Sequence, residues 1–499
     1  IAEFSSQARR DDRVRQAANI SFTANSPSDP EQGKIRLGEQ ARILADDKAK
    51  ISFSAKNRID LLGEVKTAGG SVAASVSRND NDPFDPASAV WLGSQSVVDV
   101  SGAARTYTDN RGLTKGEVLG GGSVALNAQG GYVVSEAGSR INVAGATPVR
   151  LDVRNESGDL GRNVGSDAGV LTIATSEGAL LDGTIQAHAG SAQNRGGAFD
   201  FRLDDGRNRA AINAPTNERV LNLAQATGPQ ASGLAPGETI PLALNGSTTL
   251  GTQALETAGF DRLAFASRDA IHLENGLALG AERALPLREL KLDTARVETA
   301  GGDAALHADA IRFANGTGTP APAALAGTGT LTADARLLEF SGDTTFSGMD
   351  QAVFKGAESV RFAGSGSVPN GALKTAADVV FHGAVIAPAT AAQFRIEAAG
   401  RQVSFTRNTQ TPVQPLSAYG SLMVDANDIV QDGNLWAPFG QITFKAANKL
   451  EFRDGSLTSV AATPGSLLPY GRIENGRTWV LGANGSDIEV KDLPQKTIQ

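Results

Sequence analysis

The stretch that decides the fold is ISFSAKNRIDLLGEVKTAGG at residues 51–70, because it can be set position by position above LTIATSEGALLDGTIQAHAG at residues 171–190. Apolar residues coincide along both stretches, and so do glycines. The matching pairs are Ile51 with Leu171, Phe53 with Ile173, Leu61 with Leu181, Gly63 with Gly183, Val65 with Ile185, and Gly70 with Gly190. Self-similarity of this kind indicates a repeat protein.

The same pattern returns further along the chain. It appears in LAFASRDAIHLENGLAL at 263–279 and twice in tandem, in LMVDANDIVQDGNLWAPFG at 422–440 and ITFKAANKLEFRDGSLTSV at 442–460. The two tandem copies indicate a repeat of about 20 residues. Each copy contains three short bursts in which apolar and polar residues alternate, separated by Asn, Gly, Asp or Ala.

Alternation with a period of two predicts strands that bury one face. Gly and Asn recur too often for long helices, and apolar stripes at helical spacing are missing. Three bursts in each repeat are too short for paired hairpins and too regular for a sandwich. The sequence therefore predicts an all-β, right-handed parallel β-helix (β-solenoid) with coils of about 20 residues and inserted loops, in which each strand pairs with its equivalent one coil away.

The regularity of the pattern suggests how the chain is organised. Residues 1–35 are expected to be an entry segment, and 36–223 a first β-helix stretch in which loops near 75–89 and 106–118 project from the rod. Residues 224–257 are rich in Pro, Gly and Ser, which predicts an excursion or joint. A second β-helix stretch is expected over 258–499.

Composition narrows the class of protein. The 499 residues include 57 Gly and few large aromatics, which suits a thin, layered core. The 46 basic and 54 acidic residues are mixed along the chain, so no basic stripe favours nucleic acid. There is no cysteine for disulfides or zinc-thiolate sites. Without an initiator Met, a signal-like segment or a long apolar run, the chain is expected to be an internal piece of a longer exported polypeptide.

Several phrases also point to a known family. VWLGSQSVVDVSG at 90–102, GGGSVALNAQGGYVVSEAGSRINVAGA at 120–146 and the stretch 440–481 resemble filamentous haemagglutinin-like exoproteins of Gram-negative bacteria. The resemblance covers roughly 36–481 and implies the shaft of a two-partner secretion substrate. It further implies secretion to the bacterial cell surface through an outer-membrane β-barrel transporter. NPNL- and NPNGI-like motifs of the secretion domain are not found, so recognition of the transporter is assigned to an upstream domain.

Catalytic or metal-binding clusters were sought because parallel β-helices also house polysaccharide-degrading enzymes. Asp204 and Asp205 are adjacent, so on a strand they would face opposite sides and in a turn both would be solvated. The four histidines, His188, His272, His307 and His382, lie far apart and lack partners at ligand spacing. Because they lie beside inward apolar residues, His272 and His307 are expected to face solvent.

Three other features have both a functional and a structural interpretation. The loop at 78–85 offers oxygen ligands for calcium, but a solvated turn is favoured because the loop lacks an EF-hand pattern. The glycines of 116–123 are interpreted as a tight coil corner with positive φ and not as a phosphate loop. Trp91, Trp436 and Trp479 could stack on sugars if exposed, or pack at the rod surface.

The sequence thus predicts no catalytic, cofactor or metal site and leaves the ligand unknown. The leading hypothesis is a structural and adhesive shaft acting in attachment, aggregation or biofilm, and the chain is expected not to be an enzyme. One alternative is the rod of a contact-dependent growth-inhibition protein with a distal toxin; another is a carbohydrate-active β-helix enzyme. A surface receptor or glycan and lateral self-association are the expected contacts. Phe265 and Ile442 are predicted to point into the core.

Overall fold

The structure is a computed structural model that describes residues 17–25, 32–79, 81–155, 158–281, 283, 286–365 and 368–461. It also describes the backbone of 472–474, 478–483 and 486–490. Strands dominate these residues, and the helices among them are short: η1 (Leu242–Leu244) and α2 (Thr252–Thr257). The all-β prediction is confirmed, and the strands pair in parallel from coil to coil, as a β-solenoid requires.

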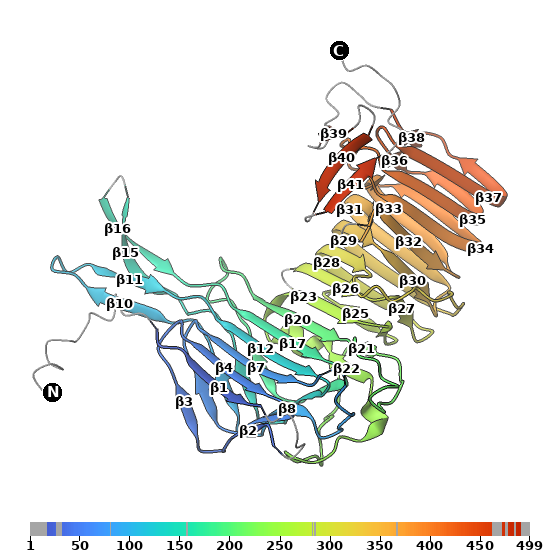
Figure 1. Cartoon of the computed structure of the whole chain (residues 1–499). Coiled ribbons are helices and arrows are strands. Elements are labelled where there is room, and N and C mark those ends of the chain that lie inside the picture. The colour runs from blue at the N-terminus through green and yellow to red at the C-terminus, as the bar shows by residue number, and fades with distance from the viewer. Residues whose placement is uncertain are drawn as a thin grey trace, which may run out of the picture.

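Three parallel ladders form the first stretch (Figure 1). The first ladder contains β1 (Ile20–Ala24), β4 (Lys50–Ala55), β7 (Ser71–Ser77), β12 (Ser123–Gln129), β17 (Val170–Thr175) and β20 (Gly197–Leu203). The second contains β2 (Lys34–Leu37), β5 (Arg58–Leu61), β8 (Ala89–Leu92), β13 (Tyr132–Ser135) and β18 (Gly178–Leu181). The third contains β3 (Arg42–Leu44), β6 (Glu64–Lys66), β9 (Val97–Asp99), β14 (Arg140–Asn142) and β19 (Thr184–Gln186).

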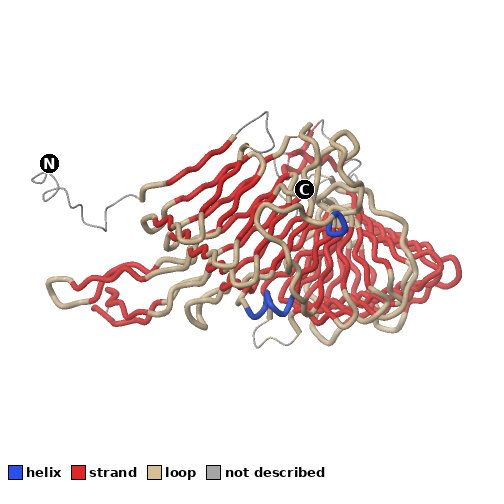
Figure 2. The backbone as a smooth tube through the Cα atoms, turned by 90° about the horizontal axis from the view of Figure 1, so that it is seen from below, coloured by secondary structure: helices blue, strands red, loops and turns tan. Residues whose placement is uncertain are grey.

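In the second stretch the stack continues with longer strands. These are β23 (Phe260–Ser267), β26 (Leu287–Asp293), β28 (Ala304–Ala314), β29 (Thr330–Ser341), β31 (Gln351–Ala363), β33 (Asp378–Pro388), β34 (Gln393–Arg407), β35 (Ser421–Asp432) and β37 (Gln441–Phe452). Shorter strands complete the coils: β21 (Val220–Ala224), β22 (Ser247–Gly251), β24 (Ala270–Leu273), β25 (Leu277–Leu279), β27 (Arg296–Thr299), β30 (Asp343–Ser347), β32 (Asn370–Thr375), β36 (Asn434–Trp436) and β38 (Leu457–Ser459). Figure 1 shows the stack changing direction between the two stretches, near β20 and β23, and Figure 2 shows the strands lying side by side along the molecule.

The register confirms the repeat that was read from the sequence. Leu61 and Leu181 belong to one column through Leu92 and Ser135, and Val65 and Ile185 belong to another through Val98 and Ile141. Leu422 pairs with Ile442. Other coils are several residues longer, because Leu171 pairs with Phe199 and Leu263 with Leu290. The predicted length of about 20 residues therefore holds for some coils only.

Phenylalanine fills much of the core of the second stretch. Phe313, Phe340 and Phe362 follow one another in register, and their neighbouring rings stack with centroids 5.4 and 5.6 Å apart. Phe354, Phe381 and Phe405 form a parallel column with centroid spacings of 5.6 and 5.5 Å. Offset and edge contacts of this kind stabilise aromatic pairs beyond the area they bury. The inner column is thus made of like residues, as parallel stacking predicts.

The two predicted loop insertions have different structures. Residues 106–118 lie in an antiparallel hairpin of β10 (Ala104–Thr108) and β11 (Thr114–Val118), and a second hairpin pairs β15 (Val149–Asn155) with β16 (Gly158–Val164). Both hairpins project from the same part of the rod (Figure 1). Between β7 and β8, the predicted projecting loop instead packs against the chain, since Phe84 N donates to Ile212 O at 2.8 Å.

The predicted excursion at 224–257 covers part of the rod. Residues 225–246, hereafter the strap, lie over the outer face of the second ladder, where Ala231 and Ile240 pack with Trp91, Tyr132 and other buried residues. The chain then enters β22 and α2 and rejoins the stack. The coils after it continue to residue 461. A separate antiparallel sheet is formed by β39 (Arg472–Glu474), β40 (Thr478–Ala483) and β41 (Ser486–Val490).

A column of glycines marks one corner of the first stretch. Gly70, Gly122 and Gly169 each precede a strand of the first ladder. A Cβ on Gly122 would lie 1.9 Å from Gly70 O, and one on Gly169 would lie 1.8 Å from Gly122 O. Of the glycines in 116–123, Gly116 has a positive φ and the others do not, so the predicted reason is wrong for Gly122. The close approach of successive coils explains instead why glycine is needed at position 122.

Candidate functional site

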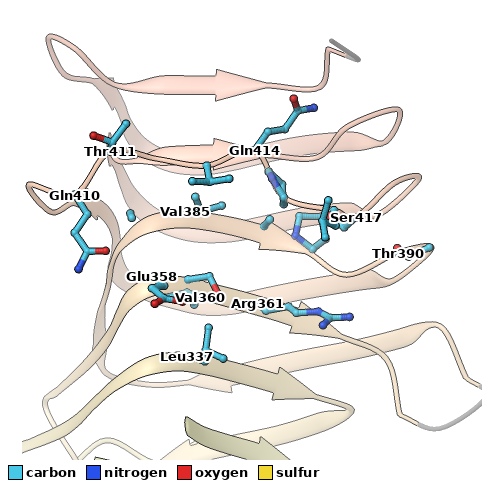
Figure 3. Close-up of a pocket in the computed structure, with 17 residues that line it drawn as sticks. Leu337, Glu358, Val360, Arg361, Val385, Thr390, Gln410, Thr411, Gln414 and Ser417 are labelled. Atoms are coloured by element: carbon cyan, nitrogen blue, oxygen red, sulfur yellow. The ribbon is translucent and has the colours of Figure 1, made fainter. Parts of the chain in front are cut away.

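An open groove on the outer surface of the second stretch is the candidate binding site (Figure 3). Its volume is about 560 Å³. The floor is the outer face of three paired strands, on which Leu337 of β29, Ser359 of β31 and Val385 of β33 are register partners. The segment Asn408–Gly420, between β34 and β35, forms the opposite wall and contributes Val413 and Leu416. An apolar floor and wall with polar groups nearby is typical of binding sites.

The groove exists because one coil leaves its ladder. Ile386 of β33 pairs directly with Leu435 of β36, although a whole coil separates them in sequence. The intervening chain, 408–420, passes outside the wall of the rod. Asn434 Nδ2 donates to Ala384 O at 3.0 Å and helps to close the gap. Trp436 packs beside the floor against Ala384, Val385 and Ala387.

The wall segment is anchored near its two ends. Asn408 Nδ2 donates to Ala357 O at 2.6 Å, and Ala391 N donates to Ala418 O at 2.9 Å. Between these anchors, the side chains of Val413 and Leu416 are each 76% exposed. Ser417 Oγ is covered by its neighbours and has no hydrogen-bond partner among the described residues. The wall therefore presents the apolar side chains of Val413 and Leu416.

Charged side chains around the groove are neutralised by neighbouring strands. Arg361 Nε lies 3.7 Å from Glu339 Oε2, and Glu358 Oε2 accepts from Arg336 Nη1 at 2.7 Å. Arg336 also pairs with Asp309, and these two carboxylates raise the pKa of its guanidinium. Groups paired in this way attract a charged ligand weakly, so the local electrostatics favour an uncharged one.

A buried ionic cluster lies in the first stretch, where the sequence predicts solvated carboxylates. Glu177, which has no exposed surface, accepts from Arg207 Nη2 at 2.7 Å, Arg209 Nη2 at 2.8 Å and Asn245 Nδ2 at 2.6 Å. Asp205 accepts from Arg207 Nε at 2.8 Å. The prediction was wrong for Asp205, which is only 2% exposed, because Arg207 and Arg209, which follow it in the irregular segment after β20, pair both with it and with buried Glu177. Asp204 is partly exposed and pairs with Arg202 at 2.6 Å.

The protonation states in this cluster follow from its contacts. Burial by itself raises the pKa of Asp205, but the hydrogen bond and charge of Arg207 outweigh burial and hold that pKa below its usual value of 3.8. Burial raises the pKa of Tyr132 to about 12, against the hydrogen bond from Asn245. The bond from Asn245 to Glu177 ties the strap to the rod, and Glu177 and Asp205 are both engaged by arginines.

The structure keeps the histidines apart, as their sequence positions suggest. His188 is exposed, and His307 and His382 are partly exposed. His382 Nδ1 lies 2.9 Å from Thr406 Oγ1. His272 lies on an outer face between buried Ile271 and Leu273, but its Nε2 is covered and has no partner among the described residues, so it does not simply face solvent.

The other sequence candidates are occupied by internal contacts. In the 78–85 loop, Asp82 pairs with Lys56, and Asp85 Oδ1 accepts from Ala87 N at 2.9 Å; position 80 lies outside the described residues. Trp91 is fully buried: Arg58 Cζ lies 5.0 Å from the centroid of its ring, and its Nε1 donates to Glu136. Trp91 is therefore not an exposed platform for sugars. The side chain of Trp479 lies outside the described residues. Sequence reasoning missed the groove, because the skipped coil leaves no local signal.

The described residues also bear on metal binding and on contact with a membrane. No group of three or more His, Cys, Asp or Glu residues is placed there to hold a metal ion. No helix in that part of the chain is long and apolar enough to cross a membrane. Comparison of the chain with protein-family models, curated proteins and solved structures found no match.

Proposed function

We propose that this chain is a structural and adhesive shaft of a large secreted exoprotein at the bacterial cell surface, acting in attachment, aggregation or biofilm. The observation that supports this most strongly is the continuous parallel stack from β1 to β38, whose core runs without interruption through both stretches. A solenoid of this kind holds distant surfaces at a fixed spacing and is built of units that contact only their neighbours.

The surface features support a role in presenting binding surfaces better than a catalytic role. Two hairpins project from the rod, and the groove opens on an outer face. The buried carboxylates Glu177 and Asp205 are both held by Arg207 and Arg209. The family resemblance of the sequence phrases adds the expectation of export through a partner β-barrel transporter.

Immunogold labelling of intact producing cells tests the proposed location. Antibody raised against this chain is expected to label the cell surface, and deletion of the gene for the partner transporter is expected to abolish the label. Beads coated with the purified chain are expected to be retained on host or bacterial cells more than uncoated beads. Label confined to the cell interior, or equal retention of both kinds of bead, would overturn the proposal.

Turnover assays distinguish the shaft from a carbohydrate-active enzyme of the same fold. The purified chain is expected to leave pectin, alginate and host glycans unchanged during long incubation. Release of reducing ends or of unsaturated products, in proportion to the amount of chain added, would contradict the shaft. Loss of killing in mixed culture after deletion of the gene would favour the growth-inhibition rod instead.

A further inference from the structure

Two segments of the second stretch leave the stack in the same way. Residues 315–329 leave between β28 and β29, and the ladder closes behind them because Val297 of β27 pairs directly with Phe346 of β30. Residues 408–420 leave between β34 and β35, and the ladder closes through Ile386 and Leu435. Each segment therefore passes outside the rod where the wall skips one coil.

In the earlier case the outer face is occupied by the chain itself. The segment TGTPAPAALAG at 317–327 runs along β30. Thr345 Oγ1 donates to Pro322 O at 2.6 Å, Leu325 N donates to Ser347 Oγ at 3.0 Å, and Gly348 N donates to Leu325 O at 3.0 Å. The molecule thus shows one occupant of such a face, an uncharged, proline-containing segment held through its backbone.

In the later case the equivalent segment stands away from part of the face and leaves the groove. The groove is lined by Leu337, which is 37% exposed, and Val385 on its strand side, and by the exposed residues Val413 and Leu416 of the segment 408–420. Ser417 also lines the groove, but its Oγ is covered, so the lining offers a ligand mainly apolar contacts. Arg361 and Glu358 are already paired with neighbouring strands.

We propose that the groove is a binding site for an extended, uncharged, proline-containing peptide segment of a partner protein. Small apolar side chains of this peptide lie between the Leu337 and Val385 floor and the Val413 and Leu416 wall. A peptide already extended by proline loses little conformational entropy on binding. The proposal rests on the geometry of the groove and stands whether or not the chain is an adhesin.

The probe for this site is a fluorescein-labelled peptide with the sequence of residues 317–327, measured by fluorescence anisotropy with the full chain. We expect saturable binding with a Kd on the order of 100 µM, as suits a small groove. A peptide in which both prolines and the leucine are replaced by serine is expected to bind at least about tenfold more weakly, because it loses the apolar contacts.

Variants of groove residues test whether the labelled peptide binds in the groove. Leu416→Glu and Leu337→Glu are each expected to weaken binding of the peptide by about tenfold or more, since a carboxylate would lie against the apolar ligand. Leu242→Glu is the matched control, because Leu242 is 57% exposed on the strap and lies outside the groove lining. Circular dichroism verifies that all three variants keep the fold.

Three results would overturn the proposal. One is no saturable binding of the peptide to the full chain. Another is equal binding by Leu416→Glu, Leu337→Glu and the parent. The third is displacement of the peptide by neutral oligosaccharides such as maltohexaose or chitohexaose, which would assign the groove to glycans.

Discussion

Individual inward residues have little room to change in this rod. Phe265 is fully buried and is the register partner of Phe201 on one side and Leu292 on the other. Its neighbour Ala264 points outward, between Asp200 and Lys291. The alternation along β23 therefore places Phe265 where water is excluded and Ala264 where a charged side chain is tolerated. The sequence predicts the inward position of Phe265 from this alternation alone.

Phe265→Asp is expected to destabilise the coils around β23 by about 4 kcal/mol or more, because it leaves a cavity and buries an unpaired charge. Hydrogen exchange should show the loss concentrated in β20, β23 and β26. Ala264→Asp adds the same charge to the outer face and is expected to change exchange little. Equal protection and protease resistance in Phe265→Asp and the parent would refute the inward placement.

Ile442→Asp is expected to cost less than Phe265→Asp. Ile442 is only partly buried and packs at the margin of the core. A charge there keeps partial access to water, so the desolvation penalty is smaller. Urea unfolding of both variants measures the difference, and a larger loss for Ile442→Asp would contradict the burial pattern.

Asp205 should make the stability of the first stretch depend on pH. Its pKa is lowered in the folded chain, so it stabilises the fold above its unfolded pKa near 3.8, and this stabilisation is lost as pH falls through the folded pKa. Asp205→Asn is expected to cost about 3 kcal/mol at pH 7, because Arg207 and Arg209 lose a buried partner. Its stability should fall less than that of the parent between pH 4 and 2. Parallel stability curves would contradict this assignment.

At the scale of elements, the strands were more predictable than the segments that connect them. Ile51, Phe53, Leu61 and Val65, which align between the repeats in the sequence, are all buried, because each strand must bury one face against the same core. The strap was predicted only as an excursion, since its Pro and Gly content hides Ile240 and Ala231, which cover Trp91. The burial of Asp205 was missed for a related reason. Arg207 and Arg209, which pair with Asp205, also hold Glu177, and Asn245 of the strap donates to Glu177, so the cluster is assembled from segments that are distant in sequence.

The strap is held at its start by one carboxylate. Asp182 accepts from Gln230 N at 2.8 Å and from Ala231 N at 2.6 Å. Asp182→Asn is expected to weaken this anchor by about 2 kcal/mol, because the charge and one acceptor are lost. Subtilisin should then cleave within 225–246 more than tenfold faster while the rest of the rod remains protected. Unchanged cleavage would show that apolar packing alone holds the strap.

At the scale of the whole molecule, each coil rests on its neighbours, and a single core runs through two stretches that point in different directions (Figure 1). The groove also depends on how whole coils stack on one another. It arises where Ile386 meets Leu435 across a skipped coil, and no local pattern in the sequence predicts which coil will leave the ladder. The shaft function likewise depends on the continuity of the stack more than on any one residue.

The most direct test of the parallel β-helix is a disulfide between register partners, because the chain has no cysteine of its own. Ala125 of β12 and Thr172 of β17 are outward partners on adjacent coils, whereas Ala174 is the partner of Asn127. Adjacent strands lie about 4.8 Å apart, within reach of a disulfide. Oxidation should cross-link Ala125→Cys with Thr172→Cys almost fully, as mass spectrometry would show, and leave Ala125→Cys with Ala174→Cys largely reduced. Equal cross-linking of the two pairs, or none in the first, would contradict the parallel stack.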